Sequence, residues 1–247
     1  MKKIFLILTT ILIFINAVAA QKTDSRSTEK PSADAVAANA AALELAKAAF
    51  AAHGGEKLHA VKTLVVRGSV DVTSAVFPQA IPGGFSMVFA GDKYRVELAN
   101  PVQSFKQTFD GVETRTNIQG GVELPPLTRL GFPLLQRMGD TGFVVSSLPA
   151  TAKKKLGFRM TAPDGFFTDF YVDEKTKQVK GYESQYENGG RIVTTSVEIE
   201  RCRTVEGVIV PEKYSQRFDL GQLVVYGDFK SKEILVNSPI ADDVFKF

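Results

Sequence analysis

Residues 85–98 read FSMVFAGDKYRVEL, and this stretch decides the fold class. Apolar side chains occupy alternate positions on both sides of Gly91 and Asp92, and charged side chains lie between them in the second half. Successive side chains of a β-strand point to opposite faces, so this period of two predicts two strands joined by a turn at the Gly-Asp pair. The stretch therefore predicts an antiparallel hairpin with one face in water.

The same period of two runs through most of the chain. It begins at Thr63 and recurs in segments up to Val236, and short turn sequences such as Asp110-Gly111 and Glu206-Gly207 separate these segments. About ten antiparallel strands joined by short turns are typical of a meandering sheet or barrel. We therefore predict a mainly β (α+β) domain, built as a curved antiparallel sheet or an unclosed β-barrel.

The segment before the first strand has helical periodicity. Asp34 can cap a helix there, and Gly54 and Gly55 can end it in left-handed conformations. A second, short helix over 56–61 leads into the strands. We expect the sheet to pack on the N-terminal helix through an apolar stripe at helical spacing, formed by Val36, Ala40, Leu43, Ala46 and Phe50.

One long stretch, 124–140, is apolar without alternating, and we call it the insertion. Its leucines fit a helix that Gly131 and Pro133 interrupt. Such a segment either covers the sheet as core or acts as a movable cover over a cavity, and the pattern does not choose between the two. We hypothesise a movable lid, because flexible glycines flank it at Gly120, Gly121 and Gly139.

The N-terminus predicts export. Lys2 and Lys3 precede an apolar run from residue 4 to residue 15, and small residues at 17–20 suit cleavage near residue 20. That run is shorter than the roughly 20 residues that span a bilayer. We therefore predict a signal peptide over 1–20, a flexible polar tether over 21–33, and one domain over 34–247 in the periplasm. We expect no integral membrane segment after cleavage.

The charge balance excludes one class of partner. The chain has a net charge of +3, which falls to +1 without Lys2 and Lys3, so nothing favours nucleic acid. The densest basic run, Lys153 to Lys155 with Arg159, could meet an acidic partner or be a solvated strand end. A single cysteine, Cys202, cannot form an internal disulfide, so the core must hold the fold.

The sequence lacks the usual motifs of catalysis. It contains no G-x-S-x-G and no glycine-rich phosphate loop, and His53, Glu56 and His59 do not reproduce the H-E-x-x-H spacing of a zinc site. The carboxylates Asp169, Asp173 and Glu174 could pair as acid and base, or simply charge a hairpin end. We predict a protein that is not an enzyme, with no catalytic residue, no metal and no cofactor.

What the chain offers instead is apolar bulk, with 18 Phe, 6 Tyr and no Trp. The apolar face of a curved sheet needs a filler, which can be core side chains, the helices or an apolar ligand. A cavity of at least about 300 Å³ would favour the ligand. Our candidate ligand-binding residues are the walls Phe85, Met87, Phe89, Tyr94, Val96, Phe105 and Phe109, and the cover Leu130, Phe132, Leu134 and Leu135.

Four segments together resemble the outer-membrane lipoprotein-sorting proteins, the LolA/LolB-like superfamily of periplasmic carriers. They are GGEKLHAVKTL at 54–64, YVDEKTK at 171–177, EGVIVP at 206–211 and NSPIADDVF at 237–245. The resemblance implies an unclosed antiparallel β-barrel wrapped over helices, with an apolar cavity for acyl chains.

We therefore expect a non-catalytic carrier or sensor of a hydrophobic ligand, the acyl chains of a lipid or lipoprotein, with a transient envelope protein partner. The alternative is a structural or interaction module of the cell envelope that binds no ligand. Such a module would fill its concave face completely and dock a partner through the sheet edge or the basic run.

Overall fold

The computed structural model describes residues 33–76, 78–101, 104–117, 124–125, 127–150, 155–188, 190–221 and 223–247. The predicted signal peptide and almost all of the predicted tether lie outside these residues, and so do Gly120, Gly121, Lys153 and Lys154. Export, cleavage and the domain boundaries therefore remain predictions.

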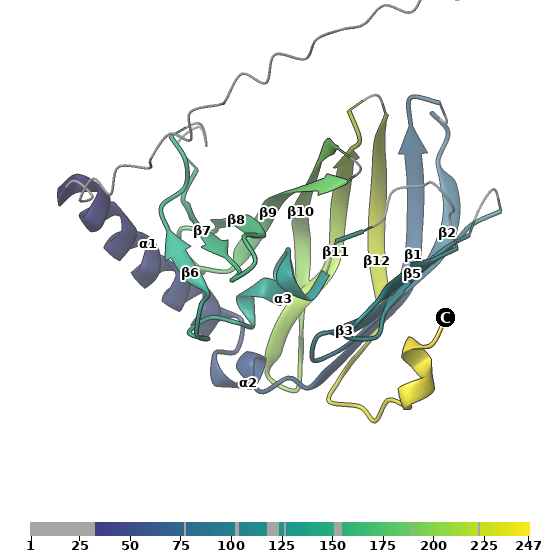
Figure 1. Ribbon diagram of the computed structural model, residues 1–247, viewed down its shortest axis with the longest axis horizontal. Helices are drawn as coiled ribbons and strands as arrows, with labels where there is room; N and C mark the ends of the chain where they lie inside the picture. The colour runs from purple at the N-terminus through teal and green to yellow at the C-terminus, as the bar shows by residue number, and fades with distance from the viewer. Residues whose placement is uncertain are drawn as a thin grey trace, which may run out of the picture. The chain divides into compact units, whose positions relative to one another are not determined.

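Twelve strands form one antiparallel sheet in the order β5-β4-β3-β2-β1-β12-β11-β10-β9-β8-β7-β6. The two edge strands, β5 and β6, do not pair, so the sheet curves without closing (Figure 1). The predicted fold class is confirmed. The strands are β1 (Thr63–Ser74), β2 (Ile81–Ala90), β3 (Lys93–Ala99), β4 (Phe105–Phe109), β5 (Thr114–Thr116), β6 (Val144–Ser146), β7 (Gly157–Thr161), β8 (Phe167–Val172), β9 (Val179–Asn188), β10 (Arg191–Val205), β11 (Val208–Asp219) and β12 (Val224–Val236).

The predicted hairpin is present as β2 and β3. Phe85 pairs with Leu98, Met87 with Val96, and Phe89 with Tyr94. Gly91 forms the turn with a φ of 58°, a left-handed conformation that glycine adopts without steric cost.

The strand order explains why the insertion lies where it does. Strands β1 to β5 run outward in one direction and β12 to β6 in the other, with β1 and β12 paired at the centre. The chain must therefore pass from one edge of the sheet to the other between β5 and β6. The insertion makes this crossing with a short 3-10 helix, η1 (Leu127–Arg129), and one turn of helix, α3 (Phe132–Leu135), instead of a long helix.

Helix α1 (Ala33–Ala52) packs on β6 and β7, and α2 (Glu56–His59) follows it (Figure 1). The buried face of α1 is Ala42, Ala46 and Ala49, which join the main core with Phe158. The predicted stripe is wrong in part, because Val36 and Leu43 are exposed by 53% and 36%, and Ala40 is exposed as well. Alanine fills most positions of this helix, so apolar spacing alone could not identify its face, and small side chains allow the closest approach to the sheet.

The composition of α1 bears on the expectation of no integral membrane segment. Its last 18 residues, Ala35–Ala52, have a mean hydropathy of 1.3 and are long and apolar enough to cross a bilayer. The helix meets this test because alanine counts as apolar, and the expectation of no integral membrane segment stays a prediction. Length and composition are weak evidence for a span, and in the structure one side of this helix packs on β6 and β7.

A final 3-10 helix, η2 (Asp242–Phe245), covers part of the opposite, convex face. Phe245 is buried there with Val65 and Val88, which alternate with the inward-facing residues of β1 and β2. The sheet therefore has a large core on its concave face and a small one on its convex face.

Candidate functional site

The seven candidate wall residues lie on one face of the sheet. Directly paired residues of antiparallel strands share a face, and the register pairs all seven with one another or with other inward residues of β1 to β4. Met87, for example, lies between Val66 and Val96. This concave face also carries the main core of the protein.

The four candidate cover residues are all buried by the insertion's crossing of the concave face. Leu134 and Leu135 have no exposed surface, and Leu130 and Phe132 are 4% and 6% exposed. The ring of Phe132 meets that of buried His53 edge-on, with centroids 5.0 Å apart. In this conformation the insertion fills the middle of the concave face and divides the remaining space into two cavities.

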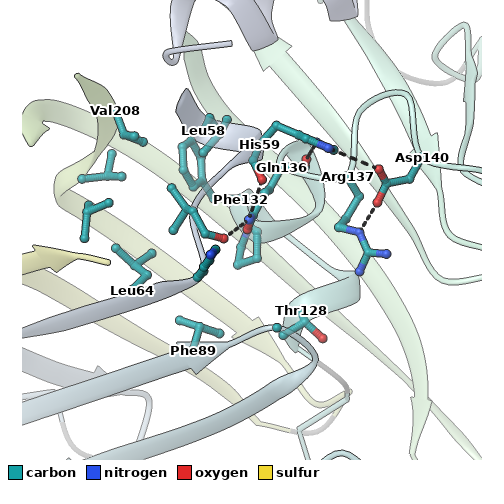
Figure 2. A pocket seen from close by; sticks show the side chains of 16 residues that line it. Leu58, His59, Leu64, Phe89, Thr128, Phe132, Gln136, Arg137, Asp140 and Val208 are labelled. Carbon is teal, nitrogen blue, oxygen red and sulfur yellow. Dashed lines mark hydrogen bonds and ion pairs between the residues drawn. The ribbon is translucent and has the colours of Figure 1, made fainter. Parts of the chain in front are cut away.

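The first, the α2 cavity, has a volume of about 260 Å³. Figure 2 shows its apolar walls, which include Leu58, Leu64, Phe89, Phe132 and Val208. Its rim is polar and consists of His59, Lys62, Gln136, Arg137 and Asp140. The cavity therefore has an apolar interior and a charged opening.

The rim residues tie the insertion to α2 and to the β2–β3 turn. His59 lies with Nδ1 3.0 Å from the carbonyl oxygen of Gln136 and with Nε2 3.8 Å from Oδ1 of Asp140. Arg137 donates from Nε to Asp140 at 2.5 Å (Figure 2) and pairs with Asp92 at 3.2 Å. These partly exposed contacts can break at small cost, because water competes for the same groups.

The second, the sheet cavity, has a volume of about 120 Å³ and lies between the insertion and the strands. Met87, Val96 and Leu98 form part of its wall, and none of the described residues that line it is charged. Phe89 and Pro133 line both cavities, so a single apolar partition separates them.

A buried polar group anchors the start of the insertion beside the sheet cavity. Gln107 donates from Nε2 to the hydroxyl of Tyr94 at 2.6 Å and to the carbonyl of Leu124 at 2.7 Å, while Leu124 N–H donates back to its Oε1 at 2.8 Å. The hydroxyl of Tyr94 donates in turn to the carbonyl of Pro125 at 3.3 Å. Tyr94 thus anchors the insertion and is stacked on Phe109. Gln107 was missed by sequence reasoning, although a glutamine between Phe105 and Phe109 on an apolar face is a usable signal.

A second anchor holds the insertion at its middle. The N–H of Gly131 donates to Oγ1 of Thr168 at 2.9 Å, and this oxygen also lies 2.8 Å from the hydroxyl of Ser184. The hydroxyl of Tyr182 bonds the backbone of Phe132, and desolvation raises the pKa of Tyr182 to about 12. The insertion is therefore held at its start by the Gln107 amide and the Tyr94 hydroxyl, and at its middle by hydroxyl groups of the concave face.

Of the eleven candidate residues, five line one of the two concave-face cavities. They are Met87, Phe89, Val96, Leu130 and Phe132. The other six line neither of the two concave-face cavities. Phe85 packs edge-on against Phe229, Tyr94 anchors the insertion, and Leu134 and Leu135 are core, while Phe105 and Phe109 are half-buried near the sheet edge.

His53 has no nitrogen free for chemistry. It is fully buried, with Nδ1 2.6 Å from the carbonyl of Ile209, and its Nε2 accepts from the N–H of Val179 at 2.9 Å. Burial disfavours the charged imidazole and lowers the pKa of His53 below 6.5. The histidine fixes the end of α1 to two strands in its neutral form.

Two of the three candidate carboxylates, Asp169 and Asp173, have separate partners. Asp169 is buried and bonds Arg159 through two contacts of 2.6 and 2.8 Å. Asp173 accepts from turn N–H groups of Thr176 and Lys175, which lower its pKa to about 2. Within the described ranges, no three His, Cys, Asp or Glu side chains gather closely enough to hold a metal ion.

No family model and no curated protein matches this sequence. Among solved structures, it is similar to a LolA superfamily protein from Nitrosomonas europaea, with a TM-score of 0.51, 11% identity, and coverage of 83% of this chain and 97% of that one. It is also similar to a domain assigned to outer-membrane lipoprotein sorting from Vibrio parahaemolyticus, with a TM-score of 0.49, 9% identity, and coverage of 84% of this chain and 97% of that one. A DUF1329 family protein from Desulfovibrio piger has a TM-score of 0.49 and 8% identity, with coverage of 85% of this chain and 97% of that one. Identities this low show the fold alone. The chain therefore has the LolA-like fold that its sequence motifs predicted.

Proposed function

We propose that the concave face binds the acyl chain of a lipid or lipoprotein, and that the protein carries or senses this ligand without catalysis. The observation that carries the proposal is the sheet cavity, a mainly apolar space in an unclosed sheet with no charged side chain among its described lining residues. Such a space suits hydrocarbon, since each buried methylene contributes about 0.8 kcal/mol. About ten methylenes would leave several kcal/mol after the cost of ordering the chain.

The size of the cavities adds a requirement. Volumes of about 260 and 120 Å³ each fall below the roughly 300 Å³ of a typical ligand pocket. Phe89 and Pro133 line both, so displacement of the segment that carries Pro133 would join the two cavities. The insertion then acts as the lid of the binding site, covering it when empty and contacting the ligand when full.

The ligand contacts that we propose are the five candidate residues that line the α2 cavity or the sheet cavity. Met87, Phe89 and Val96 supply the sheet wall, and Leu130 and Phe132 supply the lid. The polar rim of the α2 cavity, with Lys62 and Arg137, faces solvent and provides the entrance.

The location follows from the N-terminal sequence. Cleavage near residue 20 would release the domain into the periplasm, with 21–33 as its tether. An acyl carrier is useful there because lipids must cross an aqueous space between two membranes. A transient partner in the envelope would supply or receive the ligand.

The test is native mass spectrometry and lipid extraction of the protein purified from its own periplasm. We expect bound lipid with one or more acyl chains, and displacement of a fluorescent fatty acid by that lipid. Empty protein that also ignores the fluorescent fatty acid would reject the proposal. In that case the small size of the cavities favours the alternative function. The protein would then be an interaction module whose concave face is filled by its own side chains.

A further inference from the structure

Tyr186 carries a buried hydroxyl without a partner at the sheet cavity. The residue lies on β9, is 6% exposed and lines the cavity, and its hydroxyl forms no hydrogen bond within the described structure. Buried polar groups are nearly always hydrogen-bonded, because an unpaired one has lost water without replacement. An unpaired hydroxyl at the wall of an apolar cavity therefore needs an explanation.

Several polar groups around Tyr186 are engaged with other partners. The nearby hydroxyl of Tyr94 accepts from Gln107 and donates to Pro125, and its proximity, after burial, helps to raise the pKa of Tyr186 to about 12. Elsewhere in the cavity wall, Ser184 bonds Thr168, and Thr195 accepts from Gln216 at 2.9 Å. These groups bond other partners, and none of them bonds the hydroxyl of Tyr186.

The charge of the cavity limits what could complete this bond. Among the residues that the structure describes, no Asp, Glu, Lys, Arg or His lines the sheet cavity, so an ionised carboxylate or phosphate placed there would lose its hydration without gaining a cation. The cationic residues Lys62 and Arg137 line the α2 cavity instead. A neutral oxygen acceptor fits this cavity. It can accept a hydrogen bond from the Tyr186 hydroxyl, and it needs no cation beside it.

We propose that the sheet cavity selects acyl ligands that carry an uncharged carbonyl, as in an ester or amide of a fatty acid, and that Tyr186 donates a hydrogen bond to this carbonyl. The inference rests on the proposed function and deepens it by naming the ligand class. Free fatty acids, which are ionised at neutral pH, would bind less tightly. The Tyr186 hydroxyl then recognises the ester or amide linkage of the ligand, and the apolar wall contacts its hydrocarbon chain.

The test compares three ligands of one chain length on the whole mature protein: a monoacylglycerol, the free fatty acid and the plain alkane. Affinities come from displacement of a fluorescent acyl probe at neutral pH. We expect the monoacylglycerol to bind about tenfold more tightly than the fatty acid. Tyr186→Phe should weaken the monoacylglycerol about fivefold, the value of one neutral hydrogen bond, and leave the alkane unchanged.

Thermal melting of the empty protein separates this role from a structural one. Tyr186→Phe removes an unpaired hydroxyl, so its melting temperature should equal or exceed that of the unchanged protein. The matched control is Tyr182→Phe, whose hydroxyl bonds the backbone of Phe132 and whose loss should lower the melting temperature.

The outcomes distinguish the two proposals. If no acyl ligand binds the unchanged protein, the proposed function fails. If acyl ligands bind but the fatty acid equals or exceeds the monoacylglycerol, or Tyr186→Phe binds the monoacylglycerol as before, the proposed function stands and the selectivity is overturned. The comparison of ligands on the unchanged protein decides the ligand class even if the variant does not fold.

Discussion

The backbone N–H of Gly131 and the hydroxyl of Thr168 are 2.9 Å apart, and this buried hydrogen bond fixes the insertion to strand β8. The same hydroxyl lies 2.8 Å from that of Ser184 on the next strand. One threonine therefore links the moving part of the proposed site to its fixed wall.

Thr168→Val should loosen the insertion. The change keeps the shape of the side chain, removes the acceptor for Gly131, and should lower the free energy of unfolding by about 1–3 kcal/mol. Hydrogen exchange of residues 127–136 should accelerate more than that of the strands. Thr195→Val is the matched control, since Thr195 bonds Gln216 and not the insertion. Equal exchange of 127–136 in both variants would show that the bond does not hold the insertion.

Gly131→Ala should be more costly than Gly139→Ala. Both glycines have positive φ values, 65° and 91°. A Cβ at Gly131 would lie 2.9 Å from the ring of Tyr182, whereas one at Gly139 would meet nothing within 4 Å. We expect backbone strain of about 1–2 kcal/mol in each variant and a further loss only at Gly131. Chemical denaturation measures both, and equal losses would contradict the close packing at Gly131.

Phe132→Ser tests whether the insertion is a lid. If the insertion opens without unfolding the sheet, Phe132→Ser cannot destabilise the protein by more than the free energy of opening the insertion. We therefore expect a small fall in the melting temperature and weaker retention of the ligand. Phe158→Ser, in the core outside the insertion, should cost about 3 kcal/mol or more. A similarly large fall in the melting temperature for Phe132→Ser, with ligand retention unchanged, would reject the lid.

His53 makes stability depend on pH. Its pKa is lowered by burial in the folded protein, so below the ordinary value of 6.5 the unfolded chain binds a proton that the folded protein does not. The contribution of His53 is therefore complete above about pH 6.5 and is lost as the pH falls. The His53→Gln variant should be less stable than the unchanged protein at neutral pH. Its free energy of unfolding, measured by denaturation, should change less with pH between roughly pH 7.5 and 5.5. His59→Gln is the control, and an unchanged slope in His53→Gln would contradict the assignment.

Local pattern was enough to predict the fold class. The alternation in β2 and β3 gave the shared apolar face, and about ten strands were expected where twelve are present. The additional strands include the edges β5 and β6, which have three residues each and are too short to show a period. The buried face of α1 could not be predicted, because its alanines look alike on every side of the helix.

The site required information that local pattern does not contain. The pairing of β1 with β12 joins residues far apart in the sequence, and only this pairing places the insertion across the concave face. The apolar residues of the insertion were recognisable, but their division into cavity lining, such as Leu130, and core, such as Leu134, depends on how the crossing is anchored. The anchors Gln107 and Thr168 act through contacts between distant strands and loops.

One measurement tests the central claim most directly. The chain contains no tryptophan, so Phe89→Trp places a single fluorophore in the partition between the two cavities, and Tyr226→Trp places one at an exposed site on β12. A monoacylglycerol brominated along its acyl chain quenches tryptophan only at short range. We predict saturable quenching at position 89 and none at position 226. Equal quenching at both positions, or none at position 89 while the ligand binds, would contradict an acyl-binding concave face.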